Sequence, residues 1–262
     1  MTTGCIVTTT AGHVLTITIN RPDSRNALDS DANYELSAVF DRFDADPDLW
    51  LAIVTGSGDR AFCAGADLKQ AAAGYKSDRP VVPATGFGGL TARFDRSKPV
   101  IAAVNGVATG GGFELALACD IILASDNASF GLTEPRLGLA AIAGGIQRLT
   151  REIGSKRANM MLLTGRIVSA PEGEALGFVS KVVPQAELMD QVRALAEEML
   201  KCSPTSLRVT RAIAAAMDGK SIAEAMEAMT GLPAYKAMLA SPDLQEGPRA
   251  FTERRIPLWA NP

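Results

Sequence analysis

The sequence predicts an α/β protein with buried strands, and three observations support this class. Short apolar runs rich in β-branched residues alternate with segments that have helical spacing. Most of these runs are nearly continuous in apolar residues, which is typical of strands that helices cover on both faces. The 262 residues, 47% of them hydrophobic, are long enough to bury a large core in one domain or two.

The expected elements follow in chain order. Five runs are expected to form strands, at 14–19, 51–55, 100–104, 120–124 and 179–183. Between the first two, apolar residues at helical spacing predict a helix that has Asp29 or Ser30 available as its N-cap. The strands recur at uneven intervals, without a repeat of fixed period. The apolar residues of the predicted helix are Leu36, Val39, Phe40 and Phe43.

From about Ser155 onward the chain is expected to be mostly helical. Capping-box spacing occurs at 169–172 and 221–224, and Ser-Pro pairs at 203–204 and 241–242 are typical of helix starts. A helical final third attached to an α/β core indicates an appended subdomain, of a kind often used for oligomerisation. The large apolar side chains at 256–259 are expected to dock on the same subunit or on a neighbour.

The residue count with most consequence for chemistry is histidine, because the chain has only His13. A Ser-His-Asp triad or a Cys-His pair would need this one residue, and a multi-histidine metal site cannot be built from it. The four cysteines form no CxxC pair, so we expect no structural zinc, thioredoxin-type site or disulfide framework. Proton chemistry is therefore expected to come mainly from carboxylates, Lys, Tyr or backbone groups.

Charge and hydropathy predict where the protein resides. The formal net charge of −3 and the pI of about 5.4 argue weakly against nucleic acid as the main partner. The first residues lack a basic region before an apolar stretch, so no signal peptide is expected. The most apolar segments, 100–104 and 115–124, are too short for a transmembrane helix and are broken by Asn105 and Asp120. We expect a soluble cytoplasmic protein that does not insert into membranes.

Residues 75–89 are rich in Pro, Gly and polar side chains and are expected to form a mobile surface loop. Two hypotheses fit this composition, a tolerated insertion and a lid over a pocket, and the sequence does not separate them.

The first segment with chemical potential is 61–68 (AFCAGADL), which follows the second strand and its Gly-rich turn. Small residues let a ligand approach the backbone, and Asp67 is expected to cap the following helix. The N–H of Ala66 would then lie near a helix start, where the dipole favours negative charge. A tight turn before a capped helix, without any ligand, is the alternative, and the segment alone favours it.

The second segment is 105–120, in which three glycines at 110–112 lead into a helix. It is neither a Walker loop nor a GxGxxG fingerprint, but free N–H groups at such a start can bind an anion. A thioester oxygen that gains charge during a reaction would suit two N–H donors, one from each segment. Glu114, in the first helical turn, either complements the helix dipole or acts as acid or base.

The third segment is 130–145, where Pro135 is expected to hold Glu134 in an extended conformation and direct its carboxylate away from the backbone. Alone, Glu134 is best interpreted as a surface glutamate. Two carboxylates that converge on one cleft could hold and polarise a water molecule and exchange protons with a substrate. Whether Glu114 and Glu134 converge is left open by the sequence.

The three segments belong to an ordered set of motifs that covers nearly the whole chain. On these motifs the chain resembles the crotonase superfamily of enoyl-CoA hydratases and isomerases. The motifs are NRP at 20–22, NAL at 26–28, AGAD at 64–67, GGGFEL at 110–115, FGLTE at 130–134, GGIQRL at 144–149, LTG at 163–165, ALGFV at 175–179 and EGPRAF at 246–251.

The resemblance implies a crotonase-type ββα spiral core at 1–200 and a helical C-terminal oligomerisation region at 201–262. It implies a homotrimer, with dimers of trimers as a further possibility, and an acyl-CoA substrate. It implies no metal and no cofactor beyond the coenzyme A of the substrate.

The resemblance also implies the site residues. The oxyanion donors correspond to the N–H groups of Ala66 and Gly111, and the catalytic pair to Glu114 and Glu134. Because both glutamates are present, it favours hydration of a 2-enoyl-CoA, as in fatty-acid-oxidation-like metabolism. Residues implied to bind the substrate are Ala27, Leu28, Ala64, Ala66, Asp67, Gly110, Gly111 and Arg254, the last near the CoA phosphates and across a subunit boundary.

Other functions remain open. A Δ3,Δ2-enoyl-CoA isomerase or a specialised acyl-CoA dehydratase is the main alternative, because the family's PGxGG turn is replaced by AAIAGG at 140–145, with bulky Ile142. A member that binds CoA without turnover is another. An RNA-binding homologue would use the basic residues at 148, 151, 156 and 157, but a solvated helix face explains this cluster better.

Overall fold

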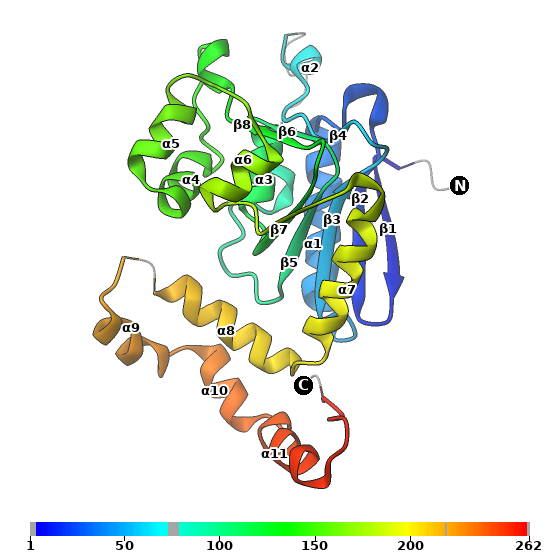
Figure 1. Ribbon diagram of the computed structural model, residues 1–262, viewed down its shortest axis with the longest axis vertical. Coiled ribbons are helices and arrows are strands. Elements are labelled where there is room, and N and C mark those ends of the chain that lie inside the picture. The colour runs from blue at the N-terminus through cyan, green and yellow to red at the C-terminus, as the bar shows by residue number, and fades with distance from the viewer. Residues whose placement is uncertain (1–3, 73–78, 218, 261–262) are drawn as a thin grey trace.

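Two sheets form the centre of the molecule, shown in Figure 1 for the computed structural model, which describes residues 4–72, 79–217 and 219–260. The larger sheet has the strand order β1-β2-β3-β5-β7-β10, with β1 antiparallel to β2 and the following pairs parallel. The smaller sheet has the order β4-β6-β8-β9, with β9 antiparallel to β8. The strands are β1 Ile6–Ala11, β2 Val14–Ile19, β3 Leu51–Gly56, β4 Ala61–Cys63, β5 Val100–Val104, β6 Val107–Thr109, β7 Ile121–Ser125, β8 Ser129–Gly131, β9 Val168–Ser169 and β10 Lys181–Val183.

Helices surround these sheets and extend the chain on one side (Figure 1). The α-helices are α1 Ser30–Ala45, α2 Leu68–Ala72, α3 Gly111–Leu117, α4 Gly145–Ile153, α5 Ser155–Leu162, α6 Ala170–Leu176, α7 Leu188–Leu200, α8 Pro204–Ala216, α9 Ile222–Met229, α10 Pro233–Ala240 and α11 Asp243–Glu253. Short 3-10 helices lie at η1 Pro22–Ser24, η2 Phe87–Gly89, η3 Glu134–Leu137 and η4 Gln185–Glu187.

The α/β class is confirmed, and β2, β3, β5 and β7 form where the apolar runs predicted strands. The expected fifth strand is shorter, because the N–H of Val179 bonds to the Gly173 carbonyl and closes the turn after α6, and the N–H of Ser180 makes the first bond to β7, at Ile122. The helix predicted over Leu36 to Phe43 is α1, and Asp29 is its N-cap, accepting a 2.9 Å hydrogen bond from the N–H of Ala32.

Both faces of the central strands are buried, as nearly continuous apolar runs predict. Successive residues of a strand point to opposite faces. Ala52 and Val54 of β3 therefore pack in the main core with α1, whereas Leu51 and Ile53 pack in a second core with α7.

The C-terminal helices α8 to α11 lie below the sheets in Figure 1. Arg211 of α8 donates to Asp120 at 3.0 Å, and Arg96 binds the same carboxylate, so α8 is tied to the core. The capping boxes expected at 169 and 221 place N-caps there: both serines accept a hydrogen bond, and Ser221 forms the full reciprocal box. At the C-terminus, the Trp259 indole donates to the Lys201 carbonyl at 2.9 Å.

The segment 75–89 is partly outside the described residues, since 73–78 are not described. For its last part the prediction of a surface loop is wrong. Phe87, Gly88 and Gly89 are buried, and Gly88 accepts no side chain easily because a Cβ there would lie 2.9 Å from Leu115. The N–H of Gly88 donates to the Asn33 side chain at 2.7 Å, which anchors η2 on α1.

Candidate active site

The three segments singled out in the sequence converge because each follows a strand of the smaller sheet. The segment with Ala66 follows β4, the segment with Gly111 follows β6, and Glu134 follows β8. These strands are parallel neighbours, so their carboxyl ends meet at one edge of the sheet. Their three-residue length left β4, β6 and β8 without a clear pattern in the sequence.

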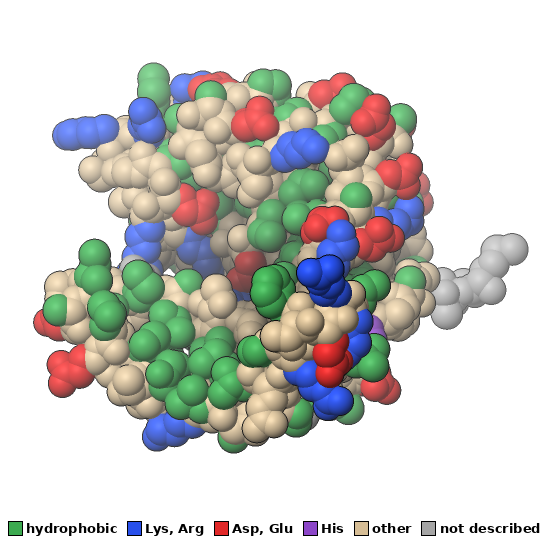
Figure 2. Space-filling view, turned by 60° about the horizontal axis from the view of Figure 1, so that its bottom comes forward, with side chains coloured by type: hydrophobic (Ala, Val, Ile, Leu, Met, Phe, Trp, Pro, Cys, Tyr) green, Lys and Arg blue, Asp and Glu red, His purple; other side chains and the backbone are tan. Residues whose placement is uncertain are grey.

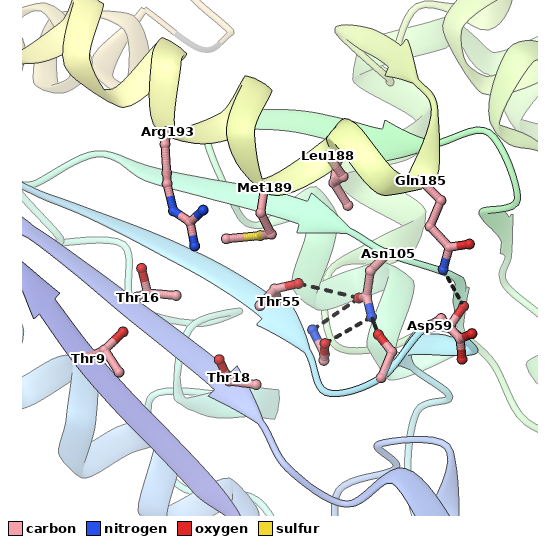
Figure 3. A pocket seen from close by; sticks show the side chains of 12 residues that line it. Thr9, Thr16, Thr18, Thr55, Asp59, Asn105, Gln185, Leu188, Met189 and Arg193 are labelled. Atoms are coloured by element: carbon pink, nitrogen blue, oxygen red, sulfur yellow. Dashed lines mark hydrogen bonds between the residues drawn. The ribbon is translucent and has the colours of Figure 1, made fainter.

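Two buried asparagines fix the strands that lead into this edge. The Asn105 amide donates to the carbonyls of Gly56 and Gly58 at 2.8 and 2.7 Å, and its oxygen accepts from the N–H of Gly56 at 3.1 Å (Figure 3). Asn26 donates to the Ala61 carbonyl at 2.7 Å. The end of β3 is therefore held to the residue that follows β5, and the start of β4 is held to the segment that follows η1.

Figure 3 shows the contacts of Asn105 at the wall of a polar cavity of about 470 Å³ between α7 and the larger sheet. Threonines line much of this cavity, and neither Glu114 nor Glu134 is among its lining residues. It is therefore distinct from the edge where the motif segments meet.

Backbone N–H groups that have no acceptor among the described residues lie at this edge. Within the described chain, the N–H groups of Ala66 and Gly111 donate to no other group. A Cβ on Gly65, whose φ is +92°, would lie 3.2 Å from the Gly111 nitrogen, so the two turns are in contact. The N-cap of α3 is Gly110, which has no side chain that could bond to the N–H groups at the start of the helix. The arrangement offers two adjacent donors to an oxygen that carries negative charge.

Glu114 contributes a deeply buried carboxyl beside these donors. Its side chain points from α3 to the turn before α4, where Oε1 accepts a 2.9 Å hydrogen bond from the N–H of Gly145. The residue is 4% exposed. The pKa of Glu114 is raised to about 7, chiefly by burial and in smaller part by the nearby Glu134, while the backbone at Gly145 and Ala143 and the charge of Arg148 oppose the rise.

Glu134 contributes the second carboxyl, from the start of η3 and next to Gly110. A Cβ on Gly110 would lie 3.3 Å from Glu134 Oε1, and Oε2 is buried without a hydrogen-bond partner in the structure. Burial raises the pKa of Glu134 above its usual range. The predicted extended conformation is wrong, because Glu134 begins η3 with Pro135 as its second residue.

The residues implied to bind the substrate fall into two groups. Ala27 and Leu28 are buried beside the Ala66 turn, where the N–H of Leu28 donates to the Gly65 carbonyl at 2.8 Å. Asp67 caps α2 by accepting from the N–H of Lys69 at 3.1 Å, as predicted. Arg254 is exposed at the end of α11, at the opposite end of the protomer from α2 (Figure 1). One protomer therefore does not bring Arg254 to the other predicted site residues.

Two further residues support the site and were not singled out for it. The Phe87 ring lies against the Cα of Gly111, where a Cβ would be 2.7 Å from the ring. Arg148 was assigned to a solvated helix face, which is wrong: it is half-buried and donates to the Thr91 carbonyl at 2.8 Å. The neighbouring basic residues at 151, 156 and 157 are exposed. The sequence signal for Arg148 was its place in the GGIQRL motif.

The turn at 140–145 presents an N–H group to Glu114 although it lacks the family's proline. Gly144 adopts a left-handed conformation with φ +97°, which directs the N–H of Gly145 toward Glu114. Ala141 is buried, whereas Ile142 is 86% exposed, so its bulk does not press on the carboxylates in the protomer.

Two features are absent from the described residues. No helix there has the length and apolar character that a membrane span requires. In the same residues, no group of three His, Cys, Asp or Glu side chains is arranged to hold a metal ion.

Comparison with known proteins gives matches over almost the full length. A sequence model of the enoyl-CoA hydratase/isomerase family matches residues 9–262. The carnitinyl-CoA dehydratase of Proteus mirabilis (strain HI4320) is 46% identical over 253 residues, 96% of each chain. The protein of the same name from Escherichia coli (strain K12) is 44% identical over 250 residues, 95% of each chain.

Solved structures agree with this assignment of fold. The crystal structure of an enoyl-CoA hydratase from Mycobacterium tuberculosis H37Rv superposes with a TM-score of 0.91 and 35% identity, covering 98% of this chain and 99% of that one. An enoyl-CoA hydratase from Bacillus anthracis gives a TM-score of 0.89 at 34% identity, covering 99% of this chain and 100% of the other.

Proposed function

Because this chain belongs to the enoyl-CoA hydratase/isomerase family, we propose that it adds water reversibly across the 2,3 double bond of an enoyl-CoA thioester. The observation that carries the proposal is a pair of carboxyls, buried Glu114 and half-buried Glu134, beside two touching turns that each present an N–H donor. An acid and a base beside an oxyanion site are the groups that hydration of a conjugated thioester requires.

The N–H groups of Ala66 and Gly111 bind the thioester oxygen in this proposal. As water adds to the β-carbon, electron density moves to that oxygen and an enolate-like transition state forms. Donors held in place before the reaction stabilise this charge without reorganising, and one such donor is typically worth about 3 to 4 kcal/mol. Close contact of the Gly65 and Gly110 turns keeps the two donors adjacent.

The two glutamates hold the water and exchange its protons. Glu114 takes a proton from the water that attacks the β-carbon, and Glu134 supplies the proton that reaches the α-carbon. The pair must then carry one proton in total, which raised pKa values at both residues favour near neutral pH. Because the two carboxyls interact, their apparent pKa values belong to the pair.

The substrate is held by its coenzyme A, and the proposed reaction uses no metal and no other cofactor. The backbone at Ala27, Leu28 and Ala64 to Asp67 lines the proposed CoA groove, next to the donors. Arg254, which is distant within one protomer, would reach the CoA phosphates of a neighbouring subunit.

We propose that the subunits form a homotrimer, with dimers of trimers as an extension. Supporting this, hydrophobic side chains gather over the C-terminal helices in Figure 2, next to a hollow of about 700 Å³ lined by α8, α10 and the 94–97 loop. Sedimentation equilibrium would measure the subunit number, and a monomer at micromolar concentration would contradict the proposal. The exposed apolar residues in this region are Met217, Ile222, Met226, Leu239, Leu244, Phe251, Ile256 and Leu258.

A second candidate is dehydration of a 3-hydroxyacyl-CoA such as carnitinyl-CoA. The observation that favours it is the 44 to 46% identity to proteins named carnitinyl-CoA dehydratase. The same residues would serve, since dehydration is the reverse of hydration.

Incubation of the purified protein with crotonyl-CoA tests the proposed reaction. Hydration removes the conjugated thioester absorbance and gives a product heavier by one water, whereas isomerisation of a 3-enoyl-CoA leaves the mass unchanged. Carnitinyl-CoA, offered separately, distinguishes the second candidate by loss of one water. Unchanged mass with every enoyl-CoA and hydroxyacyl-CoA tried would refute hydro-lyase activity.

A further inference from the structure

We propose that Arg148 is a positioning residue that holds the 143–145 turn against Glu114 and keeps the Glu114 carboxylate able to accept a proton from water. This role rests on the proposed hydration. Arg148 would act on Glu114 through the backbone and by its charge, without contacting the substrate.

Arg148 bridges two segments with one guanidinium group. From the first turn of α4, Nη2 donates to the Thr91 carbonyl at 2.8 Å, and Nη1 makes a longer contact of 3.4 Å with the Ala143 carbonyl. A Cβ on Gly144 would lie 2.1 Å from Nη1, so the guanidinium lies directly on the Gly144 backbone. The turn is therefore packed against Arg148 as well as hydrogen-bonded to it.

The same turn binds the Glu114 carboxylate. The N–H of Gly145 donates to Glu114 Oε1 at 2.9 Å, and the backbone at Ala143 also lowers the pKa of this carboxyl. A carboxylate that accepts backbone N–H bonds is stabilised in its ionised form. Arg148 thus acts on Glu114 through the backbone that it holds.

The other end of the bridge supports the oxyanion site. Thr91 is buried and follows η2, whose Phe87 ring lies against Gly111. The planar guanidinium of Arg148 reaches the carbonyls of Ala143 and Thr91. It therefore joins the turn that binds Glu114 to the segment that packs against Gly111. A lysine ammonium keeps the charge but cannot reproduce this two-point geometry.

The charges around the pair give Arg148 an electrostatic role too. The charged side chains that act on Glu114 are Glu134 from η3 and Arg148 from α4, and the adjoining β4, β6 and η2 carry no charged residue. The positive charge of Arg148 lowers the pKa of Glu114, and Glu134 raises it. Arg148 itself faces Glu114, Glu152, Arg96 and Cys119.

The experiment compares Arg148→Gln, Arg148→Lys and Arg157→Gln, a matched control that removes an exposed charge from the adjacent helix α5. The pKa of Glu114 is measured by ¹³C NMR of glutamate carboxyls in the unliganded protein, with Glu114→Gln to assign the signal. Initial rates with crotonyl-CoA give kcat and KM from pH 5 to 9. Circular dichroism verifies that each variant is folded.

Arg148→Gln is expected to raise the Glu114 pKa and to lower kcat by about 10- to 100-fold, the cost of a misplaced catalytic group. Arg148→Lys is expected to keep the Glu114 pKa near the wild-type value but to recover only part of kcat, with KM little changed. Arg157→Gln is expected to change none of these quantities.

An unchanged Glu114 titration in Arg148→Gln would overturn the electrostatic part of the inference. If Arg148→Gln does not fold, Arg148→Lys decides the matter, because full kcat in that variant would overturn the bridging role. If wild-type protein does not hydrate crotonyl-CoA, the proposed function fails, whereas the carboxyl titration needs no substrate and tests the effect of Arg148 separately.

Discussion

Replacing Glu114 by Gln should stabilise the fold at alkaline pH while removing most of the proposed activity. The Glu114 carboxyl has a pKa of about 7 in the folded protein against an ordinary value of 4.5, because it is buried. Between these two pH values the native state binds more protons than the unfolded chain, so stability is lost as the pH rises. Gln cannot ionise, and its side-chain oxygen can still accept the hydrogen bond from Gly145.

The magnitude follows from the two pKa values. At 1.36 kcal/mol per pKa unit, the raised pKa of Glu114 lowers the free energy of unfolding by about 3 kcal/mol at pH 8 and by less than about 1 kcal/mol at pH 5. Urea unfolding followed by circular dichroism at both pH values measures the difference between wild type and Glu114→Gln. Glu227→Gln, at an exposed position on α9, is the control and should show no pH-dependent gain. A gain that is equal at pH 5 and pH 8, or absent at both, would refute the reasoning.

Three further predictions concern the donor geometry, the contacts of Asn105 and a residue outside the site. Gly65→Ala should lower kcat by at least about 10-fold in crotonyl-CoA assays, because its Cβ would lie 2.8 Å from the Thr109 carbonyl and separate the donors; wild-type kcat would contradict the donor geometry. Asn105→Ala should lower the free energy of unfolding in urea by about 1 to 3 kcal/mol, since it leaves the buried backbone groups of Gly56 unpaired and removes the donor to the Gly58 carbonyl, and an unchanged midpoint would argue against this clamp. His13→Gln should leave turnover within a few-fold of wild type, because the ring stacks on Trp50 with centroids 4.0 Å apart and bonds to the Asp48 carbonyl, outside the site; near-complete loss of turnover would overturn the carboxylate mechanism.

The large elements of the fold were predictable because their residues repeat one pattern over many positions. The strands β3 and β5 are continuous apolar runs buried on both faces, and α1 has apolar residues at helical spacing behind the Asp29 cap. By contrast, β4, β6 and β8 are three residues long, too short for periodicity to show. These short strands are the elements that bring the motif segments together, so convergence of Glu114 and Glu134 could not be derived from local pattern.

Side chains that act through tertiary contacts were harder to predict. Phe87 lies in a Gly- and Pro-rich stretch that has the composition of a mobile loop, yet it is buried because glycines beside it allow close packing against α1 and α3. The basic residues near Arg148 in the sequence are exposed. Arg148 is half-buried because its guanidinium donates to the Thr91 carbonyl, a tertiary contact that the sequence does not reveal. The resemblance of the motifs supplied the site residues, and the structure supplies the distances and burial that make their proposed roles testable.

The most direct test of the central claim is the rate of crotonyl-CoA hydration by wild type, Glu114→Gln and Glu134→Gln, measured as loss of the conjugated thioester absorbance. General acid and base catalysis by the pair predicts that each substitution lowers kcat by at least about 100-fold. Circular dichroism would verify that both variants keep the wild-type fold. Undiminished turnover in both variants would contradict the account, because the reaction would then proceed without either carboxylate.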